Sequence, residues 1–445
     1  MSTSQTITPP PSFLQLAAQV IQDSAAIVTL GRVVRVTGML MEAHVPNARV
    51  GEIIEVERDG GRVPGQVVGL RESLALIVPF EDVRGVVAGA RVHRSTLGAE
   101  MPVGDALLGR VVDVFGHAID GGDPIECDAA VPIDQGAPAL GARARISERF
   151  DTGVRIIDAL LTCGRGQRFG IFAGAGVGKT MLMREILAHS NADVVVVGLI
   201  GERGCEVHDL LVGEQMARSV VVAATSDRSP LERARGAMAA TAVAEHFRDR
   251  GKHVLLVIDS LTRYAMALRE IGLAAGEPPA TKGYPPSVFA AMPRLLERAA
   301  PLAKGGSITG VYTVLVEGDD LADPVADSAR SLLDGHIVLS RAMASRGQFP
   351  AVDVLASTSR VAHRVTSHAA QVLMEKGRGM LATRREVDEL KSLGAYVPGT
   401  NATNDEALAL GARFDTWAKQ KSGHPSKYEE SMRGLSDILA AMKAA

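Results

Sequence analysis

The sequence predicts an α/β protein whose central domain holds a mostly parallel sheet, with a small β-rich domain before it and a helical region after it. Between about residues 165 and 345, near-continuous apolar runs alternate with helix-type segments, as is typical of parallel strands buried on both faces. Between about residues 27 and 95, short runs rich in Val and Ile are separated by glycine. After about residue 356 the strand patterns stop, and helical segments broken by loops follow.

The central domain has the clearest pattern. A helix is expected over about Leu231–Arg250, between two of the apolar runs. The alternation of such helices with buried strands predicts a parallel sheet covered by helices. The expected strands are RFGIF, DVVVVGLI, SVVVAAT, HVLLVID and SITGVYTVLV.

Two elements precede this domain. Residues 1–26 include an amphipathic helix, which either packs on its own domain or docks a partner. Its apolar face holds Phe13, Leu14, Ala17, Val20 and Ile21. Residues 27–96 contain several short strands with a hairpin signal at Asp59–Gly61, which predicts a small barrel or sandwich. We therefore divide the chain into residues 1–26, 27–96, 97–355 and 356–445.

Composition excludes several classes of protein. The 445 residues suit two or three domains, and 48 basic against 51 acidic residues give no surplus of positive charge for nucleic acid. Cys127, Cys163 and Cys205 are far apart and suggest neither a disulfide framework nor a metal site. No apolar run approaches the ~20 residues of a membrane span, and the first residues lack a secretory signal pattern. We expect a cytoplasmic protein that reaches a membrane only through partners.

The strongest local motif is AGAGVGKT, Ala173–Thr180, which follows an expected strand and opens a helix. A glycine-rich loop lets backbone N–H groups approach phosphates, and the helix that follows adds the positive end of its dipole. Lys179 is expected to reach the outer phosphates, and the Thr180 hydroxyl to bind Mg²⁺. The usual motif begins with Gly, where this chain has Ala173. The predicted ATP-binding residues here are Gly174, Ala175, Gly176, Val177, Gly178, Lys179 and Thr180.

Two acidic residues follow other expected strands. Asp259 ends HVLLVID and is predicted to hold the magnesium shell together with Thr180. Glu202 follows DVVVVGLI, and because ligands of open α/β sheets bind beyond the carboxyl ends of the strands, it should lie at the same edge as Lys179. Glu202 is therefore predicted to act as the base or to position the attacking water. The alternative is a surface salt bridge between Glu202 and Arg203.

These stretches together resemble the hexameric ATPase family of the rotary ATP synthase catalytic subunit, and most closely its protein-export branch, the type III secretion and flagellar export ATPases. The resemblance runs from about residue 27 to 400. It implies a RecA-like P-loop domain, preceded by a small N-terminal β-barrel and followed by a C-terminal helical domain. It rests on FAGAGVGKT, GLIGERG, VIDSLTRYAMALREIGLAAGEPPATKGYPPSVFA, VLVEGDD, LLDGHIVLSR and FPAVDVLASTSR.

The resemblance also implies roles for single residues. Glu202 is the catalytic glutamate, Arg203 its orienting neighbour, and Arg263 a phosphate-contacting arginine. Phe349 places its ring against adenine, and Arg360 is the arginine finger supplied to the next subunit, worth about 10³–10⁵ in rate. In the rotary synthase the glutamate and the finger belong to different subunit types. This chain carries both, so a homohexamer can complete every site.

The implied function is that of a Mg²⁺-dependent ATPase of the protein-translocating type, the motor of a type III export apparatus that releases chaperones and unfolds substrates. We favour an injectisome over a flagellum because of GKTMLM and VLVEGDD, although EPPATKGYPPSVFA and DPVADSAR suit the flagellar type. The implied partners are a stator-type regulator at the N-terminus, a central stalk protein in the ring pore against the loop Gly276–Pro286, chaperone–substrate complexes and an export gate at the inner membrane. No nucleic-acid partner is expected.

Three other functions fit the sequence less well. A synthase-type subunit coupled to a proton channel disagrees with EGDD, with GYPPSVFA and with both halves of the site being in one chain. A nucleic-acid translocase would need basic and stacking residues, whereas this chain is near-neutral with one Trp and five Tyr. A nucleotide-binding scaffold without turnover disagrees with the presence of Lys179, Glu202 and Asp259.

Overall fold

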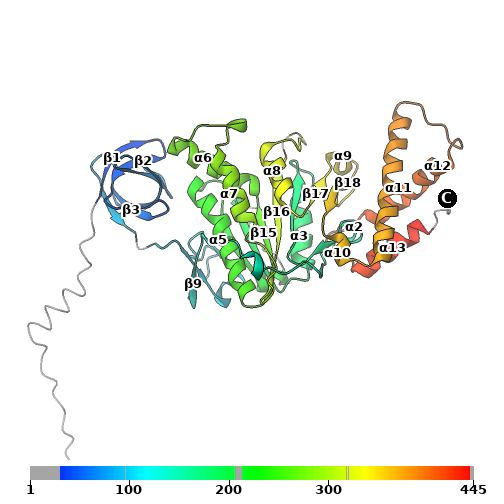
Figure 1. Cartoon of the computed structure of the whole chain (residues 1–445), viewed down its shortest axis with the longest axis horizontal. Coiled ribbons are helices and arrows are strands. Elements are labelled where there is room, and N and C mark those ends of the chain that lie inside the picture. Colours follow the sequence, from blue (N-terminus) through cyan, green and yellow to red (C-terminus); the bar gives the residue numbers. More distant parts are fainter. Residues whose placement is uncertain are drawn as a thin grey trace, which may run out of the picture. The chain divides into compact units, whose positions relative to one another are not determined.

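The computed structural model describes residues 31–95, 97–204, 206, 213–316, 318 and 320–440 (Figure 1). The amphipathic helix expected within residues 1–26 and the thiol of Cys205 lie outside these residues. The chain divides into two compact units, residues 1–98 and 99–445. Across the described part of the chain, no helix combines the length and apolar character that crossing a membrane requires.

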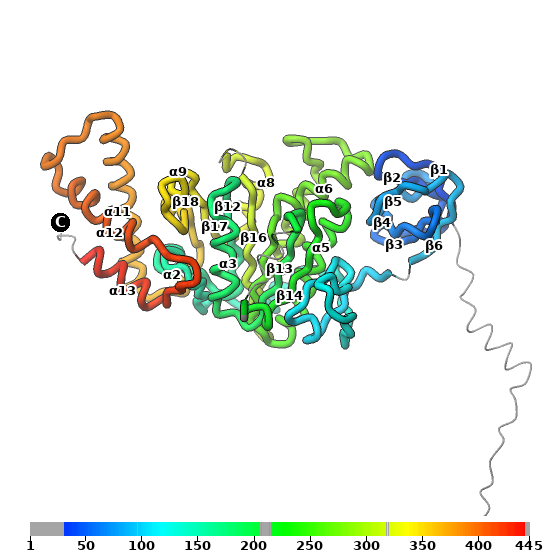
Figure 2. The backbone as a smooth tube through the Cα atoms, turned by 180° about the vertical axis from the view of Figure 1, so that it is seen from behind, coloured from blue at the N-terminus to red at the C-terminus, as the bar shows by residue number. Residues whose placement is uncertain are grey.

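The first unit is a closed antiparallel barrel with the strand order β1–β2–β5–β4–β3–β6, which Figure 2 shows from behind. Strand β6 pairs with both β1 and β3, so the sheet closes on itself and leaves no exposed edge. The predicted hairpin joins β3 to β4, with Gly60 in a left-handed conformation at φ +82°. Of the two predicted architectures, the barrel is therefore confirmed and the sandwich is not. The strands are β1 Gly31–Thr37, β2 Leu40–His44, β3 Ile53–Arg58, β4 Gly61–Arg71, β5 Leu74–Pro79 and β6 Arg91–Arg94.

The second unit is built on an eight-stranded sheet with the order β18–β17–β12–β16–β15–β13–β14–β8. Every neighbouring pair is parallel except β17 and β18, which are antiparallel. The five predicted runs are the strands β12–β16, and the prediction of a mostly parallel sheet is confirmed. The strands are β8 Arg110–Val112, β12 Arg168–Ala173, β13 Val194–Ile200, β14 Ser219–Ala224, β15 His253–Asp259, β16 Ser307–Leu315, β17 Gly335–Leu339 and β18 Val352–Ser359.

Strands β8, β17 and β18 were not predicted. β8 is three residues long, and β17 and β18 are only half-buried, so none gives a continuous apolar run. β18 also continues past residue 355, where the sequence placed a domain boundary, because it pairs with β17 at the edge of the same sheet. The four-part division of the chain stays a prediction.

Helices cover both faces of this sheet. On β13, Val195, Val197 and Leu199 pack with the helix α3, whereas Val194 and Val196 pack with α5 on the other face. Close packing of α5 depends on small residues, because a Cβ at Gly198 would lie 3.0 Å from Ala240 Cβ. The long helices of this layer are α3 Lys179–His189, α5 Pro230–Asp249, α6 Leu261–Ala275, α7 Pro286–Leu296 and α8 Pro324–Leu332.

Three further helices form the C-terminal region and pack on one another (Figure 1). They are α11 His368–Ser392, α12 Ala402–Ala418 and α13 Tyr428–Leu439, which confirms the predicted helical region. α13 and α11 also pack against the short helix α2. The smaller elements of this unit are β7 Glu100–Val103, β9 Ala129–Pro132, β10 Arg149–Phe150, α2 Arg155–Leu160, β11 Cys163–Gly164, α9 Arg341–Ser345 and α10 Ala362–Val365.

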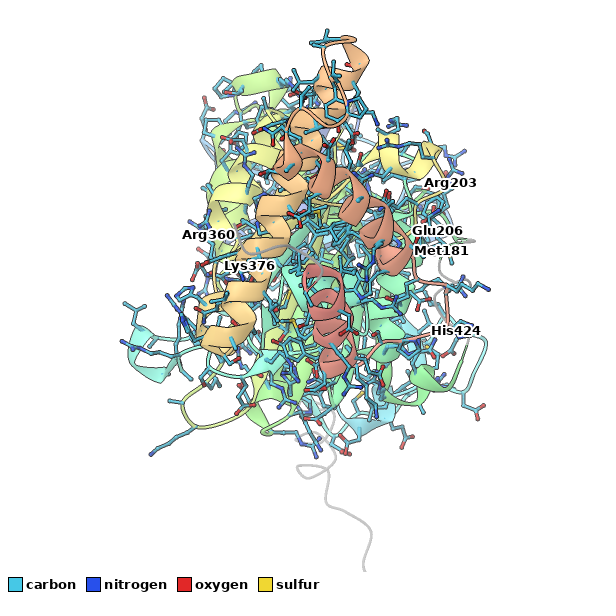
Figure 3. All side chains as sticks on the ribbon, turned by 90° about the vertical axis from the view of Figure 1, so that its right-hand side faces the viewer. Met181, Arg203, Glu206, Arg360, Lys376 and His424 are labelled. Atoms are coloured by element: carbon cyan, nitrogen blue, oxygen red, sulfur yellow. The ribbon has the colours of Figure 1, made fainter. Side chains whose placement is uncertain are left out.

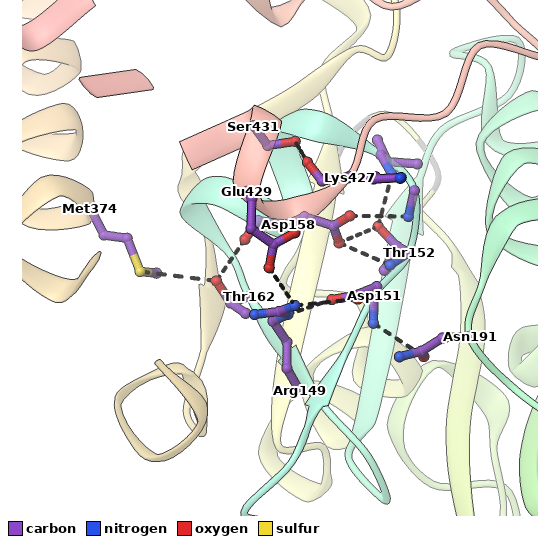
Figure 4. Close-up of polar contacts among 12 residues, drawn as sticks. Arg149, Asp151, Thr152, Asp158, Thr162, Asn191, Met374, Lys427, Glu429 and Ser431 are labelled. Atoms are coloured by element: carbon purple, nitrogen blue, oxygen red, sulfur yellow. Dashed lines mark hydrogen bonds and ion pairs between the residues drawn. The ribbon is translucent and has the colours of Figure 1, made fainter. Parts of the chain in front are cut away.

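A polar network joins α13 to the segment before α2 (Figure 4). Arg149 bonds to Asp151 and to Glu429 of α13, at 2.5 and 3.2 Å, and its guanidinium lies 3.7 Å from the centroid of the Tyr428 ring. Behind it, the fully buried Asp158 accepts hydrogen bonds from Thr152 N, Thr152 Oγ1 and Gly153 N, at 2.9, 2.7 and 3.0 Å. Burial raises the pKa of Asp158 to about 7, although these hydrogen bonds act to lower it.

The Asp158→Asn variant should lose a pH dependence of stability that the wild-type protein has. Because the folded pKa lies above the unfolded value of 3.8, protonation of Asp158 stabilises the fold. That contribution is complete below the unfolded pKa and is lost as pH rises through about 7. Relative to Asp158→Asn, wild-type stability should fall by about 3 kcal/mol between pH 5 and 8.

The measurement is a series of melting curves of the two proteins across that range. Asp327→Asn, which changes an exposed side chain on α8, is the control and should keep the wild-type slope. Parallel pH profiles for wild type and Asp158→Asn would contradict the shifted ionisation, whatever uniform stability loss the amide causes.

Candidate active site

The glycine-rich loop connects β12 to α3 at the edge of the sheet. β12 ends at Ala173 and α3 begins at Lys179, as the motif predicts. Gly176 and Gly178 have φ of +77° and +94°, a conformation that other residues rarely adopt. The loop therefore has the geometry in which backbone N–H groups and a helix N-terminus face an anion.

Lys179 lies between two carboxylates. Its Nζ is 2.5 Å from Asp259 Oδ1 and 3.7 Å from Glu202 Oε1, and all three side chains are largely buried. Asp259 ends β15 and Glu202 follows β13, the neighbouring parallel strand. Thr313 of β16 donates its hydroxyl to Asp259 as well. The structure thus brings together the three residues that were placed at one edge from the sequence.

Glu202 has the properties of a base. Burial raises its pKa, the Lys179 ammonium lowers it, and the Asp259 carboxylate raises it further. Among the described residues, its Oε1 has no hydrogen-bond partner. Its ion pair is with Lys179, and not with Arg203 as the alternative interpretation held. A buried carboxylate with an oxygen that accepts no hydrogen bond can orient a water molecule and accept its proton.

The residues expected to bind a metal supply oxygen donors. Thr180 lies in the first turn of α3, next to the Lys179 that contacts Asp259. In the ranges that the structure describes, no group of three or more His, Cys, Asp or Glu side chains is arranged to hold a metal. Mg²⁺ commonly needs only one or two protein oxygens beside phosphates and waters, so a hydroxyl and a carboxylate fit it.

Arg263 lies beside the loop that carries Glu202. A Cβ at Gly201 would be 3.0 Å from Arg263 Cβ, and the charge of Arg263 lowers the pKa of Glu202. Its Nε has no hydrogen-bond partner within the described part of the chain, so the guanidinium keeps a donor for a ligand. Arg203, next to Glu202, is exposed.

Phe349 borders the glycine-rich loop from another direction. Its side chain is 46% exposed, and a Cβ at Gly178 would lie 3.3 Å from Phe349 Cε1. The ring therefore lies beside the loop, where it can meet the base of a nucleotide whose phosphates the loop holds. The sequence analysis missed Arg341, whose Nη1 donates to Ala175 O at 3.2 Å. Arg341 ends the stretch LLDGHIVLSR, but that stretch assigns it no role, because only the placement of α9 brings it to the loop.

Arg360 lies elsewhere. Its Nη2 donates to Arg330 O at 3.3 Å, and Figure 3 shows it on the opposite side of the ribbon from Met181, Arg203 and Glu206. Within one chain, the predicted finger is thus apart from Arg203, the predicted neighbour of the catalytic glutamate.

The comparisons with known proteins agree with this architecture. Residues 153–359 match the nucleotide-binding domain of the ATP synthase alpha/beta family, and residues 33–96 match the beta-barrel domain of that family. Residues 366–437 match the C-terminal domain of the T3SS EscN ATPase.

Similar proteins carry two kinds of name, one flagellar and one of a secretion system. The flagellum-specific ATP synthase of Treponema pallidum (strain Nichols) is 46% identical over 94% of this chain and 94% of its own length. The type 3 secretion system ATPase of Xanthomonas euvesicatoria is 46% identical over 92% of this chain and 93% of its own length. Among solved structures, the assembled ATPase EscN from the enteropathogenic E. coli type III secretion system has a TM-score of 0.87 at 39% identity, covering 92% of this chain and 100% of that chain. EscN in complex with its central stalk EscO gives a TM-score of 0.84 at the same identity and coverage.

The Lys179→Ala variant should lose nucleotide binding. It removes the cation at the centre of the cluster and leaves Asp259 and Glu202 to repel a phosphate. ATP affinity should fall at least about 100-fold, measured by titration with a fluorescent ATP analogue and by competition with ATP. Lys252→Ala, which changes an exposed residue before β15, should bind as wild type. Wild-type affinity in Lys179→Ala would show that the loop does not hold the phosphates.

Proposed function

We propose that this chain is the Mg²⁺-dependent motor of a protein export apparatus. It belongs to the ATP synthase alpha/beta family, as a type III secretion and flagellar export ATPase. The observation that carries the proposal is the contact of Lys179 with Asp259 and Glu202 beside a glycine-rich loop. The match of residues 366–437 to the EscN C-terminal domain supports the export branch over a synthase-type subunit.

The geometry supports a division of labour in hydrolysis. The backbone N–H groups of the loop and Lys179 take the β- and γ-phosphates of ATP, which draws Lys179 away from the carboxylates. Thr180 and Asp259 hold Mg²⁺, and when bound it neutralises charge on the phosphates. Glu202 then orients a water molecule and accepts its proton as the water oxygen attacks the γ-phosphorus. The bond from that phosphorus to the leaving ADP oxygen breaks. Arg263 stabilises the phosphate oxygens, and Arg203 orients Glu202.

The position of Arg360 supports a homohexamer. Arg360 is on the side of the chain away from Arg203 and Glu206 (Figure 3), so an arginine finger at this position serves the site of a neighbouring copy. A head-to-tail contact of this kind, repeated by rotation, closes into a ring. Each interface then combines Glu202 of one subunit with Arg360 of the next.

The cellular setting is part of the same proposal. The ring uses ATP to release chaperones from export substrates and to unfold them, at an export gate of the inner membrane. A stator-type regulator binds the N-terminus, and a central stalk passes the loop Gly276–Pro286, which joins α6 to α7. The similarity to EscN bound to its central stalk EscO supports a stalk partner. We favour an injectisome because of GKTMLM and VLVEGDD, with a flagellum as the second candidate; relatives of both kinds are 46% identical.

The Glu202→Gln variant should bind ATP but hydrolyse it about 100- to 10,000-fold more slowly, since the amide keeps the size of the side chain and cannot accept the proton. Phosphate release and nucleotide binding are measured on the same preparation. Glu375→Gln, which changes an exposed side chain on α11, is the control and should retain wild-type activity. Unchanged turnover in Glu202→Gln would remove Glu202 from the mechanism.

The same variant tests the biological role when it replaces the gene in the source cell. Swimming and the profile of secreted proteins are scored together. Lost effectors with normal swimming would identify an injectisome motor, and lost swimming a flagellar one. If neither changed, the export function would be rejected while the ATPase activity stood.

Two inactive variants should restore each other when mixed. Arg360→Ala supplies an intact Glu202, and Glu202→Gln supplies an intact Arg360, so about a quarter of the interfaces in an equal mixture are complete. Each variant alone should be at least about 100-fold less active than wild type. Steady-state hydrolysis of the mixture is compared with the sum of the separate proteins. A mixture no more active than that sum would contradict a site shared between subunits.

A further inference from the structure

A loop of the C-terminal region reaches the nucleotide-binding domain and is held there by side-chain hydrogen bonds, beginning with those of Gln420. Residues 419–427 connect α12 to α13, and Gln420 lies near the start of this loop. The Gln420 Nε2 group donates to Gly153 O and His424 O, at 2.8 and 2.9 Å. Its Oε1 accepts from Arg155 N at 2.8 Å, the first residue of α2. The side chain therefore closes the loop on itself and ties it to the segment before α2.

The same residue touches the proposed base-binding residue. Gln420 N donates to Phe349 O at 3.0 Å. Phe349 in turn lies against Gly178 of the glycine-rich loop, where the ring is 3.3 Å from a Cβ built on that glycine. A chain of direct contacts thus runs from the phosphate loop through Phe349 to Gln420.

A second tether holds this loop to the helix that carries Lys179. Glu185 of α3 accepts hydrogen bonds from Ser422 Oγ and Gly423 N, at 2.5 and 3.0 Å. The loop between α12 and α13 is thereby attached to the nucleotide-binding domain at two points, through Gln420 and through Glu185. The backbone that presents its N–H to Phe349 has little freedom to move away.

We propose that Gln420 is a positioning residue that sets Phe349 at the correct distance from the glycine-rich loop to stack on the base of the nucleotide. The inference rests on the proposed role of Phe349 in base binding. It also connects occupancy of the base site to α12 and α13, because a shift of Phe349 pulls on Gln420 N and through its side chain on the whole α12–α13 loop.

The kinetic signature follows from where the base lies. The base takes no part in bond breaking, so contacts to it stabilise the bound substrate and the transition state equally. A change in the position of Phe349 should therefore raise KM and leave kcat nearly unchanged. A general loss of structure would instead lower the fraction of active protein, and with it kcat.

The test uses the full-length chain with two substitutions of Gln420. Gln420→Ala removes all three side-chain hydrogen bonds, and Gln420→Glu keeps the size and the acceptor for Arg155 N while losing both donors. KM for ATP should rise about fivefold to tenfold in both, with kcat within about twofold of wild type. Gln371→Ala is the matched control, since its side chain also donates to two backbone carbonyls, those of His363 and Thr366, but away from Phe349. It should keep the wild-type KM.

Two inhibitors separate base positioning from damage to the phosphate loop. ADP should inhibit the Gln420 variants about fivefold to tenfold more weakly, whereas inorganic tripolyphosphate, which has no base, should inhibit them as it does wild type. Adding Phe349→Ala to Gln420→Ala should raise KM no further than Phe349→Ala alone, because both changes act through one ring.

The outcomes divide clearly. An unchanged KM in Gln420→Glu, equal weakening of ADP and tripolyphosphate, or additive effects with Phe349→Ala would each overturn the positioning role. If Gln420→Ala fails to fold, Gln420→Glu decides alone. Failure of the proposed ATPase activity is distinct, since the wild-type protein would then hydrolyse no ATP.

Discussion

The contact of one ammonium with two carboxylates is the constraint on which the rest of the structure depends. Lys179 follows β12, whereas Asp259 and Glu202 follow β15 and β13, and β16 lies between β12 and β15. The three groups meet only because these strands are parallel and end at one edge, and because the chain crosses over β16 and β15 on its way from β12 to β13. From β16, the neighbour of β12, the chain instead continues to β17 on the other side of β12. Where connections leave neighbouring strands in opposite directions, a crevice opens at the carboxyl ends of the strands, and ligands of α/β sheets bind there. Thr313 of β16, the strand between β12 and β15, donates a hydrogen bond to Asp259.

This cluster contributes little to the stability of the fold but is well suited to binding a charged ligand. Desolvating an ion pair as buried as Lys179 and Asp259 offsets much of its attraction, and the nearby Glu202 adds a second carboxylate for one cation. In the proposed function, a triphosphate would give Lys179 stronger partners, and Mg²⁺ would do the same for Asp259. The raised pKa of Glu202 has the same origin, since burial destabilises the charged carboxylate and the nearby cation does not fully compensate. The low exposure that makes the cluster costly in the free protein therefore prepares it for a charged substrate.

Much of this could be predicted from sequence because the deciding rules are local. Strands β12–β16 are apolar on both faces, glycines mark the phosphate loop, and a polar residue after a parallel strand has only one edge at which to lie. The rules fail where tertiary placement decides. β17 and β18 alternate in burial at the edge of the sheet, so their strand pattern is weak and β18 was divided at residue 355. The bond from Arg341 to the phosphate loop and those of Gln420 to the segment before α2 join residues far apart in the chain, and neither has a local signal.

The arrangement also separates affinity from rate. If Phe349 is held by Gln420 of the same chain, the strength of base binding is set within the subunit, by the loop between α12 and α13. If the finger is Arg360, which lies on the opposite side of the chain from Arg203 in Figure 3, the speed of bond breaking is set by a neighbour. A subunit in such a ring can therefore load ATP independently and yet hydrolyse it only when the next subunit is in place. Because Gln420 also closes the loop that leads into α13, ATP binding would shift the C-terminal helices before any bond breaks. Binding would then act on the C-terminal helices of the same subunit, whereas hydrolysis would depend on the interface with the next subunit.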